Sequence, residues 1–321
     1  MNILEVKNLT KKYGDFTAVN NINFAIKKGE IFGFLGPNGA GKTSTINMLT
    51  GLSKVTEGSI NIFGIDVVKD VKKAQSIMGI VPDESNLYPE MDGFENLCFC
   101  ASLYGIGKEE REKRAKKLLE QFGLDNVGKK PFKAYSKGMK RKLTIAAGII
   151  HNPKILFLDE PTTGIDVESA RQIRSLIMDL NKKGTTVFIT THYIEEAERL
   201  CDRIAFIVKG EIVRIGTVDE LMQDVQKEKI IQFTLDSGIL DIKETLQKDF
   251  YNYKIEIIDN NTFRLYSINT ISLMSFMKYF DERGFSVYEA KVIKPTLEEV
   301  FVKITGIEAS KMKKEEEGGR K

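Results

Sequence analysis

The sequence predicts a two-part α/β protein, and three observations support that fold class. From residue 1 to about residue 215, short apolar strand-like runs alternate with helical patterns, which favours helices packed on a sheet. Between Ser85 and Ile150 the strand signals disappear and helical runs dominate. After residue 216 the order of elements becomes βαββαβ, which is typical of a small ferredoxin-like α+β module.

The first part is predicted to span residues 1–215, with a helical subdomain at about 85–150. Its clearest helix, Lys108–Phe122, is charged on one face and carries apolar residues at helical spacing. Its clear strands are short apolar runs, at Phe24–Ile26, Glu30–Leu35, Ile77–Val81, Ile155–Leu158, Thr185–Thr190 and Ile204–Lys209.

The second part is predicted to span residues 216–306 and to end in an amphipathic helix at 296–306. Asp259–Asn261 is the expected hairpin turn between its two middle strands. Residues 307–321 are charged and rich in glycine at the end, so we expect a disordered tail. The other elements are strands at 229–235, 254–258, 262–267 and 285–292, and helices at 240–249 and 270–283.

Composition gives no sign of a nucleic-acid-binding, membrane-spanning or disulfide-rich protein. The net charge of +3 is spread along the 321 residues, so it gives no argument for a nucleic-acid partner. The longest stretch without a charged residue, 265–277, is far shorter than the roughly 20 residues that span a bilayer. The first residues alternate like a strand and lack the apolar core of a signal peptide. The cysteines Cys98, Cys100 and Cys201 form no disulfide framework and are read as reduced thiols in a cytosol.

One glycine-rich loop predicts that the chain binds a nucleoside triphosphate. The spacing G-x-x-x-x-G-K-[ST] lies between an apolar strand and a helical run, which is the context that a phosphate-binding loop requires. Its glycines allow backbone N–H groups to converge on a phosphate, and the helix dipole adds to that attraction. Lys42 supplies a charge to the phosphates, and Thr43 offers a hydroxyl to Mg²⁺. The loop comprises Gly36, Pro37, Asn38, Gly39, Ala40, Gly41, Lys42, Thr43 and Ser44.

Two carboxylates follow the apolar strand at 155–158. Asp159 stands at the strand end, where it can reach the coordination shell of Mg²⁺. Glu160 points in another direction and can polarise an attacking water as a general base. His192 comes shortly after another apolar strand, at 187–190. It therefore lies at the edge of the sheet where ligands bind in open α/β folds. A neutral imidazole there can hydrogen-bond the γ-phosphate or the attacking water.

Together these motifs resemble the ATP-binding-cassette ATPases. The segment 135–142 occupies the place of that family's LSGGQ signature, with Ser136 and Gly138 preserved and with Lys137 and Met139 replacing its first glycine and its glutamine. This form is similar to exporter ATPases of the daunorubicin-resistance and sodium-extrusion type. The resemblance implies that Ser136 and Gly138 grip the γ-phosphate of ATP bound to the opposite subunit, with a helix dipole and backbone N–H groups.

Three further positions carry over from the resemblance. Tyr13 matches the aromatic residue that stacks on adenine, a contact worth about 1–3 kcal/mol. Asp166 belongs to the D-loop that crosses the dimer interface. Asp83 stands where the family usually has a glutamine that touches Mg²⁺, and its carboxylate is one methylene shorter and charged.

The resemblance implies an ATP-hydrolysing exporter subunit with ATP and Mg²⁺ as cofactors. Its partners would be a separate integral-membrane permease and a second copy of the chain, and its place the cytoplasmic face of the membrane. The cargo stays open between drug, peptide, lipid and ion. Two alternatives are a non-transport cassette ATPase acting on ribosomes or DNA, and a cassette that signals or confers immunity. The chain has one cassette and no sustained heptads, which argues against the first.

The loop after Asp83 carries large apolar residues, among them Leu87 and Tyr88. They either pack against neighbouring helices or form an exposed apolar patch for a partner. We expect the exposed patch, because the resemblance places the docking groove for the permease there.

Overall fold

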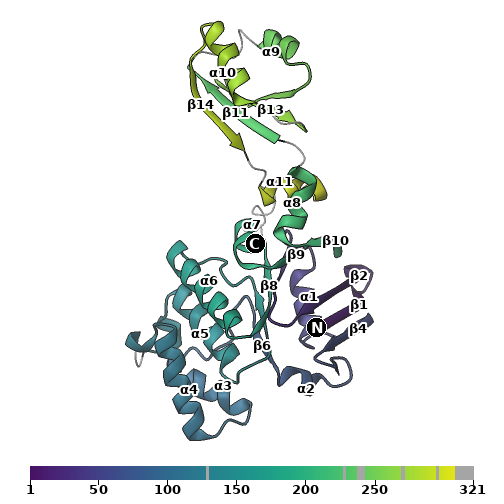
Figure 1. Cartoon of the computed structure of the whole chain (residues 1–321). Coiled ribbons are helices and arrows are strands. Elements are labelled where there is room, and N and C mark those ends of the chain that lie inside the picture. The colour runs from purple at the N-terminus through teal and green to yellow at the C-terminus, as the bar shows by residue number, and fades with distance from the viewer. Residues whose placement is uncertain (128–129, 227–228, 237–242, 269–271, 294–295, 308–321) are drawn as a thin grey trace. The chain divides into compact units, whose positions relative to one another are not determined.

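The computed structural model describes residues 1–127, 130–226, 229–236, 243–268, 272–293 and 296–307 (Figure 1). The predicted tail at 307–321 therefore lies outside the described residues, apart from its first position. The chain divides into two compact units, and each is described by itself. Asp219–Lys303 form the second unit, and the other described residues belong to the first. The predicted boundaries were 215 and 306, so the observed second unit begins and ends three residues further in.

A six-stranded sheet forms the centre of the first unit. Strands β3 and β8 are buried at every residue, as expected for strands covered on both faces. Phenylalanine rings from these strands and their neighbours pack against one another in the core, namely those of Phe24, Phe32, Phe34, Phe157 and Phe188. The strand order is β10-β9-β3-β8-β7-β6, with bounds Glu211–Gly216, Arg203–Val208, Ile31–Leu35, Thr186–Thr191, Ile155–Asp159 and Met78–Val81.

A second sheet of the same unit was only partly predicted. It is antiparallel in the order β2-β1-β4-β5, with bounds Phe16–Lys27, Asn2–Tyr13, Glu57–Ile62 and Ile65–Asp66. The sequence indicated a strand-like alternation in the first residues and a clear strand at Phe24–Ile26, and helices were expected between strands. The pairing of β1 with β2 contains several register shifts, which break the period-2 pattern that identifies a strand.

Helices cover the central sheet and also form a separate helical layer. The long run without strands between Ser85 and Ile150 is confirmed, since it folds into α3, α4, α5 and two short 3₁₀ turns. In Figure 1 these three α-helices gather on the side of the unit away from β1, β2 and β4. The helices are α1 Lys42–Leu49, α2 Val71–Gln75, α3 Gly93–Leu103, α4 Lys108–Gln121, α5 Lys137–Ile149, α6 Val167–Lys182 and α7 Ile194–Leu200, with 3₁₀ turns at Asp125–Val127 and Phe132–Ala134.

The second unit has the predicted βαββαβ order. Its antiparallel sheet has the order β12-β13-β11-β14, and the turn at Asp259–Asn261 joins β12 to β13 as expected. Its core is aromatic, with Phe233, Phe263, Phe276 and Phe280 fully buried. The elements are α8 Val218–Gln226, β11 Lys229–Leu235, α9 Lys243–Asp249, β12 Lys254–Ile257, β13 Thr262–Ser267, α10 Leu273–Glu282, β14 Val287–Ile293 and α11 Leu297–Thr305.

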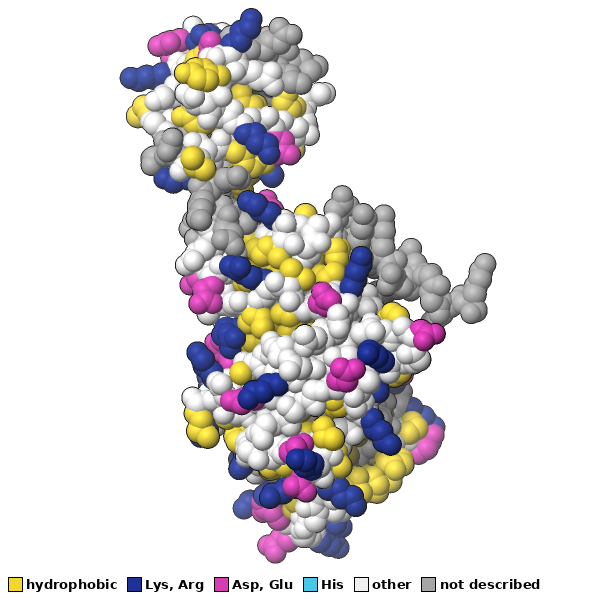
Figure 2. Space-filling view, turned by 90° about the vertical axis from the view of Figure 1, so that its right-hand side faces the viewer, with side chains coloured by type: hydrophobic (Ala, Val, Ile, Leu, Met, Phe, Trp, Pro, Cys, Tyr) yellow, Lys and Arg dark blue, Asp and Glu magenta, His cyan; other side chains and the backbone are white. Residues whose placement is uncertain are grey.

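Within the described part of the chain, no helix has both the length and the apolar character to cross a bilayer. On the face shown in Figure 2, Lys and Arg side chains are interspersed with Asp and Glu.

Candidate functional site

The strand order brings the predicted motifs to one edge of the central sheet. Strands β3, β8, β7 and β6 are neighbours and run parallel, so the loops after them lie side by side. The loop after β3 is the glycine-rich loop, and β8 is followed by His192. The loop after β7 carries Glu160, and that after β6 carries Asp83. Segments far apart in the sequence thus form one site.

The phosphate loop has the backbone that its sequence predicts. Gly39 and Gly41 have φ angles of 75° and 99°, and Gly41 directly precedes the first turn of α1. A Cβ at Gly36 would lie 2.1 Å from the carbonyl oxygen of Ile207, so this position has no room for a side chain. The buried ammonium of Lys42 donates to the carbonyls of Gly36 at 2.8 Å and Pro37 at 3.1 Å.

We expect Gly41→Ala to destabilise the nucleotide-free chain more than the matched change Gly39→Ala. Both positions have positive φ, so both alanines carry the backbone strain of that region. Only the alanine at 41 would also meet a backbone atom, the carbonyl of Ala18 at 2.5 Å, whereas space is open at 39. The extra cost should be about 1–3 kcal/mol. Urea unfolding followed by circular dichroism measures it, and equal destabilisation by the two changes would show that the loop relaxes around the new methyl group.

Asp159 and Thr43 bring a carboxylate and a hydroxyl together, a pair of oxygens that would suit a small hard cation. Asp159 is buried at the end of β7 and accepts a hydrogen bond from the hydroxyl of Thr190. Burial raises the pKa of Asp159 and outweighs the hydrogen bonds from Thr190 and Thr43 that lower it. A buried carboxylate beside a hydroxyl fits Mg²⁺, which takes few protein ligands and completes its shell with phosphate oxygens and waters. Among the described residues, no group of three or more His, Cys, Asp and Glu could hold a metal by itself.

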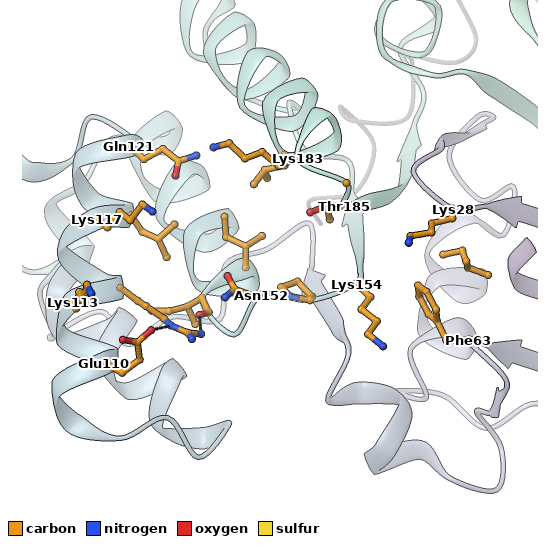
Figure 3. Close-up of a pocket in the computed structure, with 18 of the residues that line it drawn as sticks. Lys28, Phe63, Glu110, Lys113, Lys117, Gln121, Asn152, Lys154, Lys183 and Thr185 are labelled. Atoms are coloured by element: carbon orange, nitrogen blue, oxygen red, sulfur yellow. Dashed lines mark hydrogen bonds and ion pairs between the residues drawn. The ribbon is translucent and has the colours of Figure 1, made fainter. Parts of the chain in front are cut away.

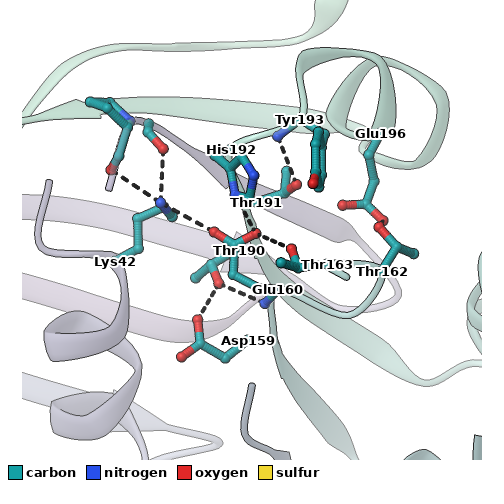
Figure 4. A network of polar contacts seen from close by, with 12 residues as sticks. Lys42, Asp159, Glu160, Thr162, Thr163, Thr190, Thr191, His192, Tyr193 and Glu196 are labelled. Carbon is teal, nitrogen blue, oxygen red and sulfur yellow. Dashed lines mark hydrogen bonds and ion pairs between the residues drawn. The ribbon is translucent and has the colours of Figure 1, made fainter. Parts of the chain in front are cut away.

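Glu160 is the centre of a buried polar network (Figure 4). One carboxylate oxygen lies 3.2 Å from the ammonium of Lys42. The other accepts hydrogen bonds from Nδ1 of His192 at 2.9 Å and from the hydroxyl of Thr163 at 3.0 Å. The backbone of Glu160 has a φ of 46°, a conformation uncommon for a residue with a side chain. This turn directs Glu160 away from the strand axis and toward the phosphate loop, whereas Asp159 stays in the strand.

The charge state of Glu160 suits a general base. Burial alone would raise its pKa, but the hydrogen bond from His192 and the charge of Lys42 outweigh it and lower the pKa. Because an ionised carboxylate only accepts hydrogen bonds, Nδ1 of His192 carries the proton that it shares. The carboxylate is therefore ionised at neutral pH and can take a proton from water.

The signature residues form a second cluster at two helix N-termini. Ser136 caps α5, and its hydroxyl accepts from the amide of Met139 at 3.3 Å. Asp166 caps α6 and accepts from the amide of Ser169 at 2.8 Å. A Cβ at Gly138 would lie 2.3 Å from the hydroxyl of Ser169, so the first turns of α5 and α6 are in close contact.

Within the described residues, no hydrogen bond or ion pair joins these signature residues to the network around Glu160. The structure therefore separates the predicted site residues into two sets. One surrounds the phosphate loop, and the other presents Ser136, Gly138 and Asp166 at helix ends.

Tyr13 and Asp83 occupy partly exposed positions. The ring of Tyr13 ends β1, is 51% exposed, and has the ammonium of Lys11 4.7 Å from its centroid. An exposed ring of this kind can stack on a base. Asp83 is solvent-exposed on one side, and the partial burial of its carboxylate raises its pKa, while the charge of Arg141 lowers it.

Sequence reasoning missed the residues that support the site, above all Arg141. Arg141 is buried in α5. It lies three residues after Gly138 and four before Ile145, so it shares one buried face of the helix with them. A charge on the apolar stripe of a helix was therefore a signal available in the sequence. Thr162 and Glu196 were missed too. Thr162 donates a 2.6 Å hydrogen bond to Glu196, whose pKa is raised by burial.

The prediction of an exposed apolar patch after Asp83 is wrong for Leu87. Leu87 is only 8% exposed, so its side chain is not part of an exposed patch. Tyr88 is 49% exposed, and its ring meets Phe99 edge-on at 4.9 Å. Of the two residues, only Tyr88 is available to a partner.

A separate groove of the first unit lies away from this site. A groove of about 990 Å³ lies between α4, the end of α5 and the start of β7, and it contains no predicted site residue (Figure 3). Its lysines include Lys113, Lys117 and Lys154.

Comparison with known proteins identifies relatives of the whole chain. A family model described as ABC transporter matches residues 19–163. The linearmycin resistance ATP-binding protein of Bacillus subtilis (strain 168) is 45% identical over 237 residues, 74% of this chain and 76% of the relative. The daunorubicin resistance ATP-binding protein of Streptomyces coeruleorubidus is 33% identical over 307 residues, 94% of this chain and 96% of the relative.

A solved structure shares the fold of the site. It is a dimeric ATP-binding cassette in a post-hydrolysis state with bound ADP and Pi, and it is 30% identical with a TM-score of 0.62. The match covers 67% of this chain and 98% of that structure.

Proposed function

The chain belongs to the ABC transporter ATP-binding proteins, and we propose that this ATPase drives an exporter whose membrane-spanning part is another polypeptide. The observation that carries the proposal is the network of Lys42, Glu160 and His192, which unites a phosphate-binding lysine with an ionised base. The names of the linearmycin and daunorubicin relatives support resistance by export. The cargo would be bound by the membrane subunits.

We infer that the working form is a dimer of two cassettes around two ATP molecules. Each site would take Lys42, Thr43 and Glu160 from one copy and Ser136 and Gly138 from the other. The separation of these residues into two sets within one chain supports this arrangement. Helix N-termini attract phosphate, and among the described residues the hydroxyl of Ser136 hydrogen-bonds the start of its own helix rather than the phosphate loop. Tyr13 would stack on the adenine, and Asp166 would lie at the dimer interface.

In each site Thr43 and Asp159 would hold Mg²⁺, with Asp83 as a further oxygen ligand directly or through water. The ion would neutralise the phosphates. Lys42 would bind the β- and γ-phosphates, and Glu160 would take the proton of the attacking water while His192 holds its carboxylate in place. ATP would favour the closed dimer and hydrolysis would release it, which moves the membrane subunits.

The rival function is an ATPase that acts on ribosomes or DNA. Co-expression with a candidate membrane subunit of the exporter, followed by membrane isolation, separates the two functions. An exporter subunit should move to the membrane fraction only when its partner is present, at the cytoplasmic face. Vesicles holding both proteins should then transport in response to ATP. Recovery with ribosomes or DNA, whether or not the membrane protein is present, would contradict export.

We predict that Tyr88→Ala weakens recovery of the chain with that membrane protein while ATP binding and ATPase activity of the isolated chain persist. The exposed half of the ring is free to contact a partner, and its other contact is the edge of Phe99. Truncating an anchoring tyrosine typically costs an interface about 1–2 kcal/mol, or about 5- to 30-fold in affinity. Tyr251→Ala is the matched control, since that tyrosine is exposed in the second unit. Full recovery of the Tyr88 variant would place the docking surface elsewhere.

A further inference from the structure

We propose that Arg141 is a positioning residue that holds the signature helix α5 against the carboxyl ends of β6 and β7, where Asp83 and Asp159 lie. Through this contact, the state of the nucleotide at one set of site residues would reach Ser136 and Gly138. The inference goes beyond the proposed export function, because it concerns how the ATPase itself is held together.

The guanidinium of Arg141 binds backbone carbonyls from two separate loops. Its Nη1 donates to the carbonyl oxygens of Pro82 and Asp83, the latter at 2.9 Å. Its Nε donates to Pro161 at 3.0 Å, and its Nη2 donates to the carbonyl of Asp159. All three nitrogens of one side chain are thus used to join the segment after β6 to the segment after β7.

The contact is specific to arginine. The guanidinium is a rigid planar fork with five N–H donors, whereas a lysine ammonium is a single point with three. A lysine can reach one of the loops well but cannot match both sets of carbonyls at once. Because these carbonyls belong to the main chain, Arg141 fixes the loops themselves.

The charge of Arg141 is also placed among carboxylates. Burial lowers the pKa of Arg141, and the nearby charges of Asp83, Asp159, Glu196 and Glu160 oppose that shift. Lys42 and His192 in turn contact Glu160. A buried arginine is costly unless its donors are satisfied and acidic groups surround it. Both conditions hold here, so this arginine has a structural reason to stay in the apolar stripe of α5.

The link gives α5 a direct connection to nucleotide. Ser136 begins the same helix that carries Arg141 one and a half turns later. A shift of the Asp83 or Asp159 loop would pull on the guanidinium and tilt the helix that presents Ser136. A change in that position matters because misplacing a reacting group by about 1 Å can reduce a rate about 100-fold.

The test compares Arg141→Lys and Arg141→Gln with the control Arg171→Gln, which changes an exposed arginine of α6 that forms an ion pair with Glu168. Three measurements are made on the full chain: ATP affinity in EDTA, the kcat and KM of ATP hydrolysis, and amide hydrogen exchange of nucleotide-free protein. We expect kcat to fall about tenfold or more in both Arg141 variants, with ATP affinity in EDTA changed by less than about threefold. Exchange should rise at 82–84, 159–161 and 137–149 and stay unchanged in the control.

Unchanged exchange and unchanged kcat in Arg141→Lys would overturn the proposal. An equal loss of ATP affinity and kcat would also overturn it, because it would place Arg141 in the binding of nucleotide. Should Arg141→Gln fail to fold, the lysine variant keeps the test decisive. The exchange measurement does not depend on dimerisation or export, so failure of the proposed function is distinguishable from failure of this inference.

Discussion

Glu160→Gln is expected to abolish steady-state ATP hydrolysis while leaving ATP binding largely intact. The amide keeps the shape of the side chain and can still accept hydrogen bonds from His192 and Thr163, but it cannot take a proton from water. Loss of a general base typically reduces a rate about 100- to 10,000-fold. The variant also loses the ion pair with Lys42, which leaves that ammonium free for the phosphates. The ATP-bound dimer should therefore accumulate.

Steady-state phosphate release and size-exclusion chromatography with ATP measure these two effects. Glu168→Gln is the matched control, because that exposed glutamate in α6 pairs with its helical neighbours Arg171 and Gln172. Thermal unfolding of both variants reports any loss of stability from removing a buried charge. Hydrolysis by Glu160→Gln at near the rate of the control would remove Glu160 from the mechanism.

The sequence predicted those parts of the fold and site that depend on short local patterns. The glycine loop, the strand ending in Asp159 and the βαββαβ order of the second unit all have such patterns, and the structure contains each of them. The assembly of the loops after β3, β8, β7 and β6 followed from the rule that parallel strands share an edge.

Other features depend on tertiary contacts that no local pattern records. The long β1 and β2 strands were underestimated because their bulges interrupt the alternation of buried and exposed residues. Leu87 looked like a surface residue because it lies in a polar loop, but it is buried in the folded chain. The role of Arg141 depends on carbonyls from 18 to 59 residues away in sequence, so only the folded chain could show what it binds.

Complementation between two inactive variants is expected to restore ATPase activity if each site is shared by two copies. Lys42→Ala removes the buried ammonium that binds Gly36, Pro37 and Glu160, and so destroys the phosphate-loop half of a site. Ser136→Arg blocks the other half, at the N-terminus of α5. In a mixed dimer one site carries both defects and the other carries neither.

Equal mixing gives about half mixed dimers, each with one intact site, so up to about a quarter of wild-type activity should return. Mixing each variant with itself is the control and should return no activity.

If ATP hydrolysis requires two intact sites in the same dimer, turnover stays low, and a second arm of the experiment then decides the question. In that arm Glu160→Gln is added to both chains, and ATP-dependent dimers are counted by chromatography with differently tagged copies. An intact composite site should retain ATP and hold the mixed pair together, whereas neither parent should dimerise. Mixed pairs that form no more readily than the parents would show that Ser136 does not complete the site of another copy, and that the two sets of residues meet in some other way.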